Sequence, residues 1–206
     1  AWNGKKFQYR GTFVSLTENF CSIGMEQPAG NKITGNPSSH PALSVKWVED
    51  FPDIPLNRNE AYKLRVTSKG VEIEAITETG VYRAIQTLRQ LTEKKGNGIA
   101  ITGCEITDWP AFRIRGFMQD VGRTYISTDE LKREIAILAR YKINVFHWHL
   151  TENQAWRLQS KVFPMLNDSV NTTRQPGKYY TLEEARELAA FCKQHQISSR
   201  AAQSVR

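Results

Sequence analysis

The sequence lacks several features that would place it in a specialised class of protein. Its 206 residues contain only three cysteines, Cys21, Cys104 and Cys192, and their wide separation argues against a disulfide framework or a zinc site. No apolar run approaches the roughly 18 to 20 residues that cross a bilayer. The N-terminal stretch AWNGKKFQYR has no hydrophobic signal-peptide segment, although a leader removed earlier would leave none. We therefore expect a globular protein with three ordinary thiols.

Clustered positive charge is also missing, although the formal net charge is +7. Lysine and arginine are spread along the chain and mostly alternate with acids, as in TLEEARELAAFCK, and no run of five or more basic residues occurs. We interpret the charge as a solvated surface and expect neither a nucleic-acid nor a membrane partner. Nucleic-acid binding is kept as a third hypothesis, which a strong salt dependence of DNA retention would revive.

Residues 1–108 have the pattern of a small α+β domain. LSVKWVED and AYKLRVTSKGVEIEAIT alternate apolar and polar side chains, as strands do, and SKG supplies the turn of a hairpin. TGVYRAIQTLRQLTEKKG changes to a three- and four-residue repeat and predicts a helix that stops at Gly96. GIAITGCEIT predicts another strand, and FQYRGTFVSL is compatible with one. The repeating apolar residues of the helix are Val81, Ile85, Leu88 and Leu91.

From residue 109 onward the order is strand, helix, strand, long loop and helix, which is typical of parallel β/α folds. FRIRGFMQDV is the first strand, and INVFHWHL is an apolar strand of the kind that protein covers on both faces. Ser127 with Glu130, and Thr181 with Glu184, have the spacing of helix capping boxes. Leu131, Ile135 and Leu138 form the inward face of the first helix, and Leu182, Ala185, Leu188 and Ala189 that of the second.

Polar side chains follow both predicted parallel strands at their carboxyl ends. They are Asp120 and Arg123 in DVGR, and His149, Glu152 and Asn153 in HLTEN. Because functional residues of parallel α/β folds lie just past these strand ends, we expect these side chains to face one rim. His147 lies within the apolar run and is interpreted as a core histidine.

The segments DWPAFRIRGFMQDVGR, KINVFHWHLTENQAWRL and FPML together resemble the start of the catalytic domain of glycoside hydrolase family 20, the β-N-acetylhexosaminidases. The family has Pro-x-Phe before a strand ending in Asp-x-x-Arg, then Lys-x-Asn-x-x-x-x-His, an acidic patch and a Trp-Arg pair. The stretch from EAYKLRV to RQL is similar to the small α+β domain that precedes the family's barrel. The resemblance covers roughly residues 45 to 197. It implies an α/β fold, with this small domain at residues 1–108 and the first part of an incomplete (β/α)8 TIM barrel at 109–206.

The resemblance implies an exo-acting hydrolase that removes terminal β-linked N-acetylglucosamine or N-acetylgalactosamine from glycans. In this family the substrate assists its own cleavage through its 2-acetamido group, so no protein nucleophile is needed. An Asp orients the acetamido group, and the adjacent Glu protonates the leaving oxygen and later activates water. The resemblance implies no metal and no organic cofactor, and a periplasmic or secreted location.

Matched residue by residue, the resemblance assigns Arg123 and Glu152 to substrate binding. Arg123 grips hydroxyls of the sugar, Glu152 joins the hydrogen-bond network of the subsite, and Asp120 and His149 support them from behind. Two positions depart from the family: Glu152-Asn153 replaces a common Asp-Asp, and Thr124 stands where a His commonly follows the arginine. The Trp-Arg pair of the family falls on Trp156 and Arg157, for which we expect a structural role.

The resemblance stops at Ile197, and the polar, basic SSRAAQSVR that follows is not expected to form a buried strand. Such a break is typical of a shifted reading frame, a premature stop or foreign residues. A complete barrel has about 250 residues. The family's catalytic Asp-Glu pair has no counterpart, because the dipeptide Asp129-Glu130 opens a helix and is explained by capping.

Two hypotheses therefore remain for this chain. In the first it is the N-terminal part of a family 20 hexosaminidase, with no hydrolysis expected from the chain alone. In the second it is an inactive, self-associating fragment or a carbohydrate-binding module. Uncovered sheet edges and apolar faces predict self-association or a loose C-terminal half. The preferred amino sugar and linkage are not determined by the sequence.

Overall fold

The computed structural model describes residues 6–16, 42–95 and 98–203. It divides into two compact units, Ala1–Arg113 and Ile114–Arg206. Within the part of the chain that is described, no helix is both long enough and apolar enough to cross a membrane.

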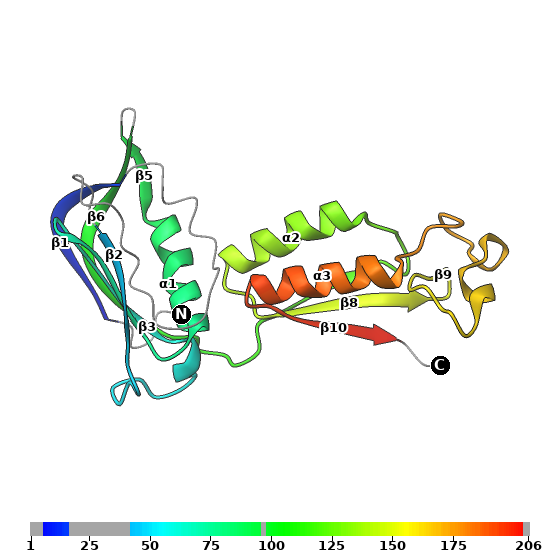
Figure 1. The fold of residues 1–206 in the computed structure, drawn as a ribbon, viewed down its shortest axis with the longest axis horizontal. Helices are drawn as coiled ribbons and strands as arrows, with labels where there is room; N and C mark the ends of the chain where they lie inside the picture. The colour runs from blue at the N-terminus through cyan, green and yellow to red at the C-terminus, as the bar shows by residue number, and fades with distance from the viewer. Residues whose placement is uncertain (1–5, 17–41, 96–97, 204–206) are drawn as a thin grey trace. The chain divides into compact units, whose positions relative to one another are not determined.

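The described part of the N-terminal unit is a mixed sheet with helix α1 on its face (Figure 1). The strand order is β1-β6-β3-β4-β2, and β5 also pairs with β6. The strands predicted from the alternating segments are confirmed, including the hairpin that turns at SKG. FQYRGTFVSL, which the sequence pattern left open, forms strand β1. The elements are β1 (Lys6–Leu16), β2 (Ala42–Trp47), η2 (Arg58–Glu60), β3 (Tyr62–Thr67), β4 (Gly70–Ala75), α1 (Glu78–Gln90), β5 (Thr92–Lys95) and β6 (Gly98–Asp108).

The core of this unit lies between the sheet and α1. Alternate residues of β3 and β4 are buried and meet the apolar stripe of α1. The helix approaches so closely that a Cβ on Gly80 would lie 2.5 Å from the carbonyl oxygen of Ala61. Glycine is therefore required at this contact. The buried side chains include Tyr62, Leu64, Val66, Val71, Ile73, Val81, Ala84, Leu88 and Ile101.

The predicted extent of this helix is wrong at its C-terminal end. The helix ends at Gln90, with Leu91 as its C-cap, and Thr92–Lys95 form β5 against β6. The hydroxyl of Thr92 donates to the carbonyl of Arg89, which offers the chain an alternative to another helical turn. β6 then supplies strand partners that the local helical pattern did not reveal. Gly96, predicted as the stop, lies outside the described residues.

The C-terminal unit is built on three parallel strands in the order β10-β8-β7. Both helices cover the same face of this sheet (Figure 1). Both predicted capping boxes are confirmed, so Asp129-Glu130 does open a helix and Glu130 pairs with Ser127. The elements are β7 (Gly116–Asp120), α2 (Thr128–Arg140), β8 (Val145–Glu152), β9 (Ala155–Trp156), η3 (Pro164–Asn167), η4 (Ser169–Asn171), α3 (Leu182–Gln194) and β10 (Ser198–Gln203).

The prediction that the segment after Ile197 does not form a buried strand is confirmed for residues 198–201, although this segment does form a strand. Ser198–Gln203 form β10, which pairs in parallel with β8 from Val145 to Thr151. The backbone groups of β8 offer ladder partners whatever the side chains of the incoming segment are. The polar composition of the segment agrees with its exposure, because the side chains of residues 198–201 all lie in solvent. β10 is a strand in its backbone pairing, and the side chains of residues 198–201 do not contribute to a core.

Two predictions about burial in the C-terminal unit are wrong. β8 is covered on one face, where Phe146, Trp148 and Leu150 are buried, but the face that carries His147 is only half-buried. His147 is therefore no core histidine, and its ring lies 6.1 Å from that of His149. On α3, Ala189 is exposed, because the buried stripe of this helix runs through Leu188 and Cys192.

The expectation of ordinary thiols is confirmed for two of the three cysteines. Cys104 and Cys192 are free and buried in separate units. Burial raises the pKa of the Cys192 thiol to about 11 and also raises that of Cys104, so both stay protonated and unreactive at neutral pH. Cys21 lies outside the described residues.

Candidate functional site

Strand pairing brings the two polar strand ends together. In the parallel register of β7 and β8, Asp120 lies opposite His149. Beyond β7, the backbone N–H groups of Val121 and Gly122 both donate to the carbonyl of His149, at 3.0 and 3.2 Å. The first residues of the loop after β7 are thereby held against the end of β8.

Gly122 permits the loop to lie this close. A Cβ at this position would lie 2.9 Å from the backbone nitrogen of Glu152 and 3.0 Å from its Cβ. Any other residue would push the two strand ends apart. Because of this contact, Arg123 follows at a point where its side chain reaches Glu152.

Arg123 is held by two carboxylates. Its Nε lies 3.2 Å from Oδ2 of Asp120, and its Nη2 lies 3.5 Å from Oε1 of Glu152. Its backbone N–H also donates to Oδ1 of Asp120, at 3.1 Å. The carboxylates are mostly covered, whereas 62% of the Arg123 side chain remains exposed. The guanidinium is thus fixed on one side and open to solvent on the other.

Glu152 is surrounded by hydrogen-bond donors. The backbone N–H of Asn153 donates to its Oε2 at 3.3 Å, and Nε2 of His149 lies 3.3 Å from its Oε1. The Asn153 N–H, then His149 and Arg123, hold the pKa of the Glu152 carboxyl below its ordinary value. Glu152 is therefore ionised at neutral pH and balances the charge of Arg123.

Arg157 ties the loop after β9 to the loop after β7. Its side chain is fully buried, and the guanidinium donates to backbone carbonyls only, among the partners that the structure gives for it. One of these carbonyls, at 3.1 Å, belongs to Val121, two residues before Arg123. The other three belong to Arg174, Gln175 and Lys178, at 2.7, 3.2 and 2.7 Å. This geometry agrees with the structural role expected for Arg157.

The structure brings four of the predicted residues together: Asp120, Arg123, His149 and Glu152. Asn153 contributes its backbone N–H, while its side chain is exposed, as is Thr124. The sequence reasoning missed Gln175, whose Oε1 accepts the N–H of Tyr125 at 2.5 Å. It also missed the ring of Tyr180, which stacks on Tyr125. Both residues come from the long loop, which has no periodic pattern to mark them.

The geometry supports two kinds of chemistry. A planar guanidinium with one open side can donate to a pair of neighbouring hydroxyl oxygens, and the flanking carboxylates can accept from the same hydroxyls. In addition, ligand atoms of Asp120, His149 and Glu152 all lie within 4.8 Å of one another. This arrangement therefore suits a polyhydroxylated ligand or a cation.

Comparison with family models identifies the family to which the chain belongs. Residues 23–109 match domain 2 of glycosyl hydrolase family 20, and residues 112–199 match its catalytic domain. The chain belongs to glycosyl hydrolase family 20. The fold is accordingly the family's α+β N-terminal domain followed by the first part of its barrel. The four site residues all lie in the part that matches the catalytic domain.

Individual family 20 members support this assignment. A β-hexosaminidase of Porphyromonas gingivalis is 38% identical over 84% of this chain, which spans 22% of that protein. A β-N-acetylhexosaminidase of Cellulomonas fimi is 34% identical over 80% of this chain, which spans 32% of that protein. A solved Vibrio harveyi exo-β-N-acetylglucosaminidase in complex with N-acetylglucosamine superposes with a TM-score of 0.74 at 26% identity. That superposition covers 95% of this chain and 34% of the Vibrio protein.

Proposed function

We propose that this chain supplies part of the sugar subsite of a β-N-acetylhexosaminidase and that Arg123 binds ring hydroxyls of a terminal β-linked N-acetylhexosamine. The observation that carries the proposal is the position of the Arg123 guanidinium, which two carboxylates hold while 62% of its side chain stays exposed. The family assignment and the N-acetylglucosamine complex of the Vibrio relative support the choice of sugar. We also propose a glycan substrate and an extracytoplasmic location, periplasmic or secreted.

The reaction proposed for the whole enzyme is substrate-assisted cleavage. The carbonyl oxygen of the sugar's 2-acetamido group attacks the anomeric carbon, the glycosidic bond breaks, and a carboxylic acid protonates the leaving oxygen. Water then opens the cyclic intermediate, with net retention of configuration. Arg123 and Glu152 serve this reaction by fixing the sugar ring, because donors held in place before binding lose little freedom when the substrate arrives.

The acid and the residue that orients the acetamido group are not assigned to any residue of this chain. The Asp-Glu dipeptide of the sequence is Asp129-Glu130, and Glu130 is engaged in the capping box with Ser127. We therefore propose that the chain alone binds sugar but does not hydrolyse β-N-acetylglucosaminides. Turnover of a chromogenic N-acetylglucosaminide by the purified chain, abolished by Arg123→Ala, would overturn this proposal.

The binding proposal is tested by titrating the chain with N-acetylglucosamine and following the amide signals of residues 120–123 and 149–153 by NMR. We expect weak, roughly millimolar binding, because a single sugar makes few contacts. Arg123→Ala is expected to weaken it by about tenfold to a hundredfold, since each hydrogen bond to a charged donor contributes about 1.5 to 3 kcal/mol.

Two variants serve as controls for this titration. Arg123→Lys keeps the charge but loses the planar fork of donors, so an intermediate affinity is expected. Arg186→Ala removes an exposed arginine from α3 and is expected to bind as the parent chain does. Equal affinity of the parent chain and Arg123→Ala would contradict the proposed subsite.

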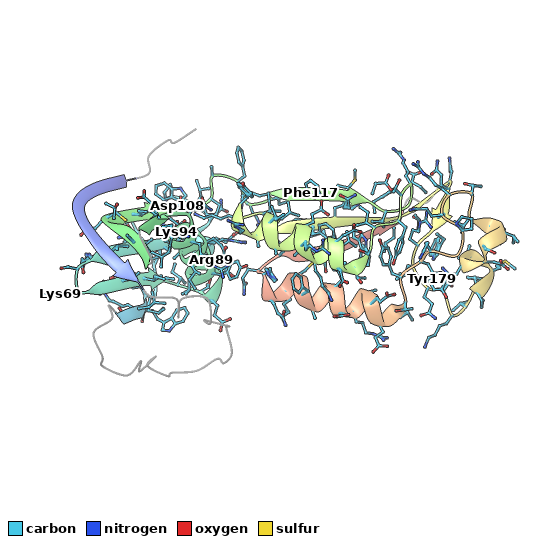
Figure 2. All side chains as sticks on the ribbon, turned by 90° about the horizontal axis from the view of Figure 1, so that it is seen from above. Lys69, Arg89, Lys94, Asp108, Phe117 and Tyr179 are labelled. Carbon is cyan, nitrogen blue, oxygen red and sulfur yellow. The ribbon has the colours of Figure 1, made fainter. Side chains whose placement is uncertain are left out.

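We also propose that the chain self-associates through the outer strands of its parallel sheet. Among the strands that the structure describes, β7 and β10 are the outer ones of this sheet, and outer strands favour pairing with another chain. β7 also exposes apolar side chains: Met118 is 56% exposed, and Phe117, labelled in Figure 2, is 37% exposed. A second copy of the chain offers the same strand edges and apolar side chains.

Sedimentation velocity at increasing protein concentration tests this self-association. The sedimentation coefficient is expected to rise with concentration, and Met118→Lys is expected to weaken the association by about tenfold, because a lysine on an outer strand opposes pairing. Val162→Lys is the matched control, because Val162 is equally apolar and 78% exposed but lies in the loop after β9. A single monomeric species at all concentrations would refute the proposal.

A further inference from the structure

Three side chains at the carboxyl ends of β7 and β8 form a set of potential metal ligands. One ligand atom each from Asp120, His149 and Glu152 lies within 4.8 Å of the others, and all three side chains are half-buried. Ligand atoms of a tetrahedral zinc ion lie roughly 3.3 Å apart, given Zn–N and Zn–O bonds of about 2.0 to 2.2 Å. Nε2 of His149 and Oε1 of Glu152 are already 3.3 Å apart. Closing the triad therefore takes a movement of about 1.5 Å by side chains that are not fully packed.

This triad already holds a cation, which is the guanidinium of Arg123. It contacts the two carboxylates of the triad, with N–O distances of 3.2 and 3.5 Å. Because more than half of the Arg123 side chain is exposed, the guanidinium can move into solvent and stay hydrated, and an incoming cation then neutralises the two carboxylates. A competing cation with stronger ligand bonds has room to take its place.

We propose that Asp120, His149 and Glu152 bind a divalent transition-metal ion of the Zn²⁺ class, which displaces Arg123 and thereby blocks the sugar subsite. The metal acts as an inhibitor here and takes no part in the hydrolytic reaction. The blocking of the sugar rests on the proposed function, whereas the binding of the metal does not.

The donor set selects the class of metal. One imidazole nitrogen with two carboxylate oxygens suits Zn²⁺, Cu²⁺ or Ni²⁺, whereas Mg²⁺ and Ca²⁺ prefer oxygen ligands alone. Three protein ligands leave a fourth position for water, as in open zinc sites. The parallel pairing of Asp120 with His149 fixes two of the ligands on neighbouring strands, so the site does not depend on a loop to assemble.

Calorimetric titration of the 206-residue chain with ZnCl₂, without sugar, tests the metal site. We expect one saturable site, with at least a tenfold loss of affinity in His149→Ala, because one of three ligands is removed. His195→Ala is the matched control and is expected to bind zinc as the parent chain does, since His195 caps the C-terminal end of α3. MgCl₂ is expected to give no comparable binding. An absence of zinc binding, or unchanged affinity in His149→Ala, would overturn the proposal.

Arg123→Ala is expected to change the affinity for zinc and the affinity for sugar in opposite directions. Removing the resident cation is expected to increase zinc affinity by about tenfold, because the two carboxylates are then free of their positive partner, while the same change weakens sugar binding. Reduced zinc affinity in Arg123→Ala would contradict the displacement of Arg123.

A sugar titration with EDTA present and a second one with zinc present separate the two proposals. Sugar binding with EDTA that zinc lowers by tenfold or more supports both proposals. Absent sugar binding with EDTA, together with intact zinc binding, would reject the sugar subsite alone. Intact sugar binding that zinc leaves unchanged would reject the metal block alone.

Discussion

Replacing Arg157 with methionine is expected to lower the free energy of unfolding of residues 114–206 by about 4 kcal/mol. Methionine fills a similar volume but donates no hydrogen bond. Four backbone carbonyls would lose their partner at once, and three of them lie in the loop after β9. Burial lowers the pKa of the Arg157 guanidinium, but arginine stays charged at neutral pH, so the four bonds are charge-assisted.

Hydrogen exchange at the amides of β8 measures this effect, because it reports the opening free energy of this unit separately from that of the N-terminal unit. Exchange in Arg157→Met is expected to be faster by about three powers of ten than in the parent chain, which corresponds to about 4 kcal/mol. Arg186→Met, at an exposed position on α3, is the control and is expected to change the opening free energy by less than about 0.5 kcal/mol. Similar exchange in the two variants would show that Arg157 does not hold the loops together.

Replacing Gly122 with alanine is expected to cost about 2 kcal/mol of stability and to weaken sugar binding by about tenfold. The added Cβ would lie 2.9 Å from the backbone nitrogen of Glu152 and 3.0 Å from the carbonyl carbon of Thr151. Carbon atoms in favourable contact lie about 3.5 to 4.0 Å apart, so the backbone must move. That movement separates Arg123 from Glu152 and disturbs the two N–H groups that donate to the His149 carbonyl.

Gly116→Ala is the matched control for this substitution. Gly116 begins β7, and a Cβ there would meet Val145 at 3.9 Å, an ordinary contact. We expect a stability change of less than about 0.5 kcal/mol and unchanged sugar affinity. The same denaturant titrations and NMR titrations serve both variants. Sugar affinity equal to that of the parent chain in Gly122→Ala would show that the close approach of the two strand ends is not needed for binding.

Local patterns predicted most of the elements because each pattern has a physical cause within a few residues. The capping boxes at Ser127 and Thr181 depend on contacts three residues apart, and both are present. The alternation of apolar and polar residues in β3 and β4 reflects one buried face, so these strands could also be predicted from the sequence. The strand at Thr92, predicted as helix, and the strand at Ser198, which the sequence pattern does not indicate, have a different cause. Both segments become strands because a neighbouring strand offers backbone partners, and a pattern within the segment does not encode such a partner.

The candidate site was predictable for a similar reason. Asp120, Arg123, His149 and Glu152 follow two parallel strands, and the carboxyl ends of parallel strands meet at one edge of the sheet. The support from the long loop was not predictable, because Gln175 lies 50 residues from its partner Tyr125. The hydrogen-bond partners of Arg157 could not be predicted either, because every residue has a backbone carbonyl oxygen and the sequence does not mark which ones accept.

The measurement that tests the central claim most directly is the NMR signal of the Arg123 Nε–H group during titration with N-acetylglucosamine. Its assignment comes from the loss of that signal in Arg123→Ala. If Arg123 binds the ring hydroxyls, this signal shifts in step with sugar concentration and shows nuclear Overhauser contacts to ring protons of the sugar. A sugar that shifts other signals of the chain, while the Arg123 Nε–H signal stays constant through saturation, would contradict the proposed subsite.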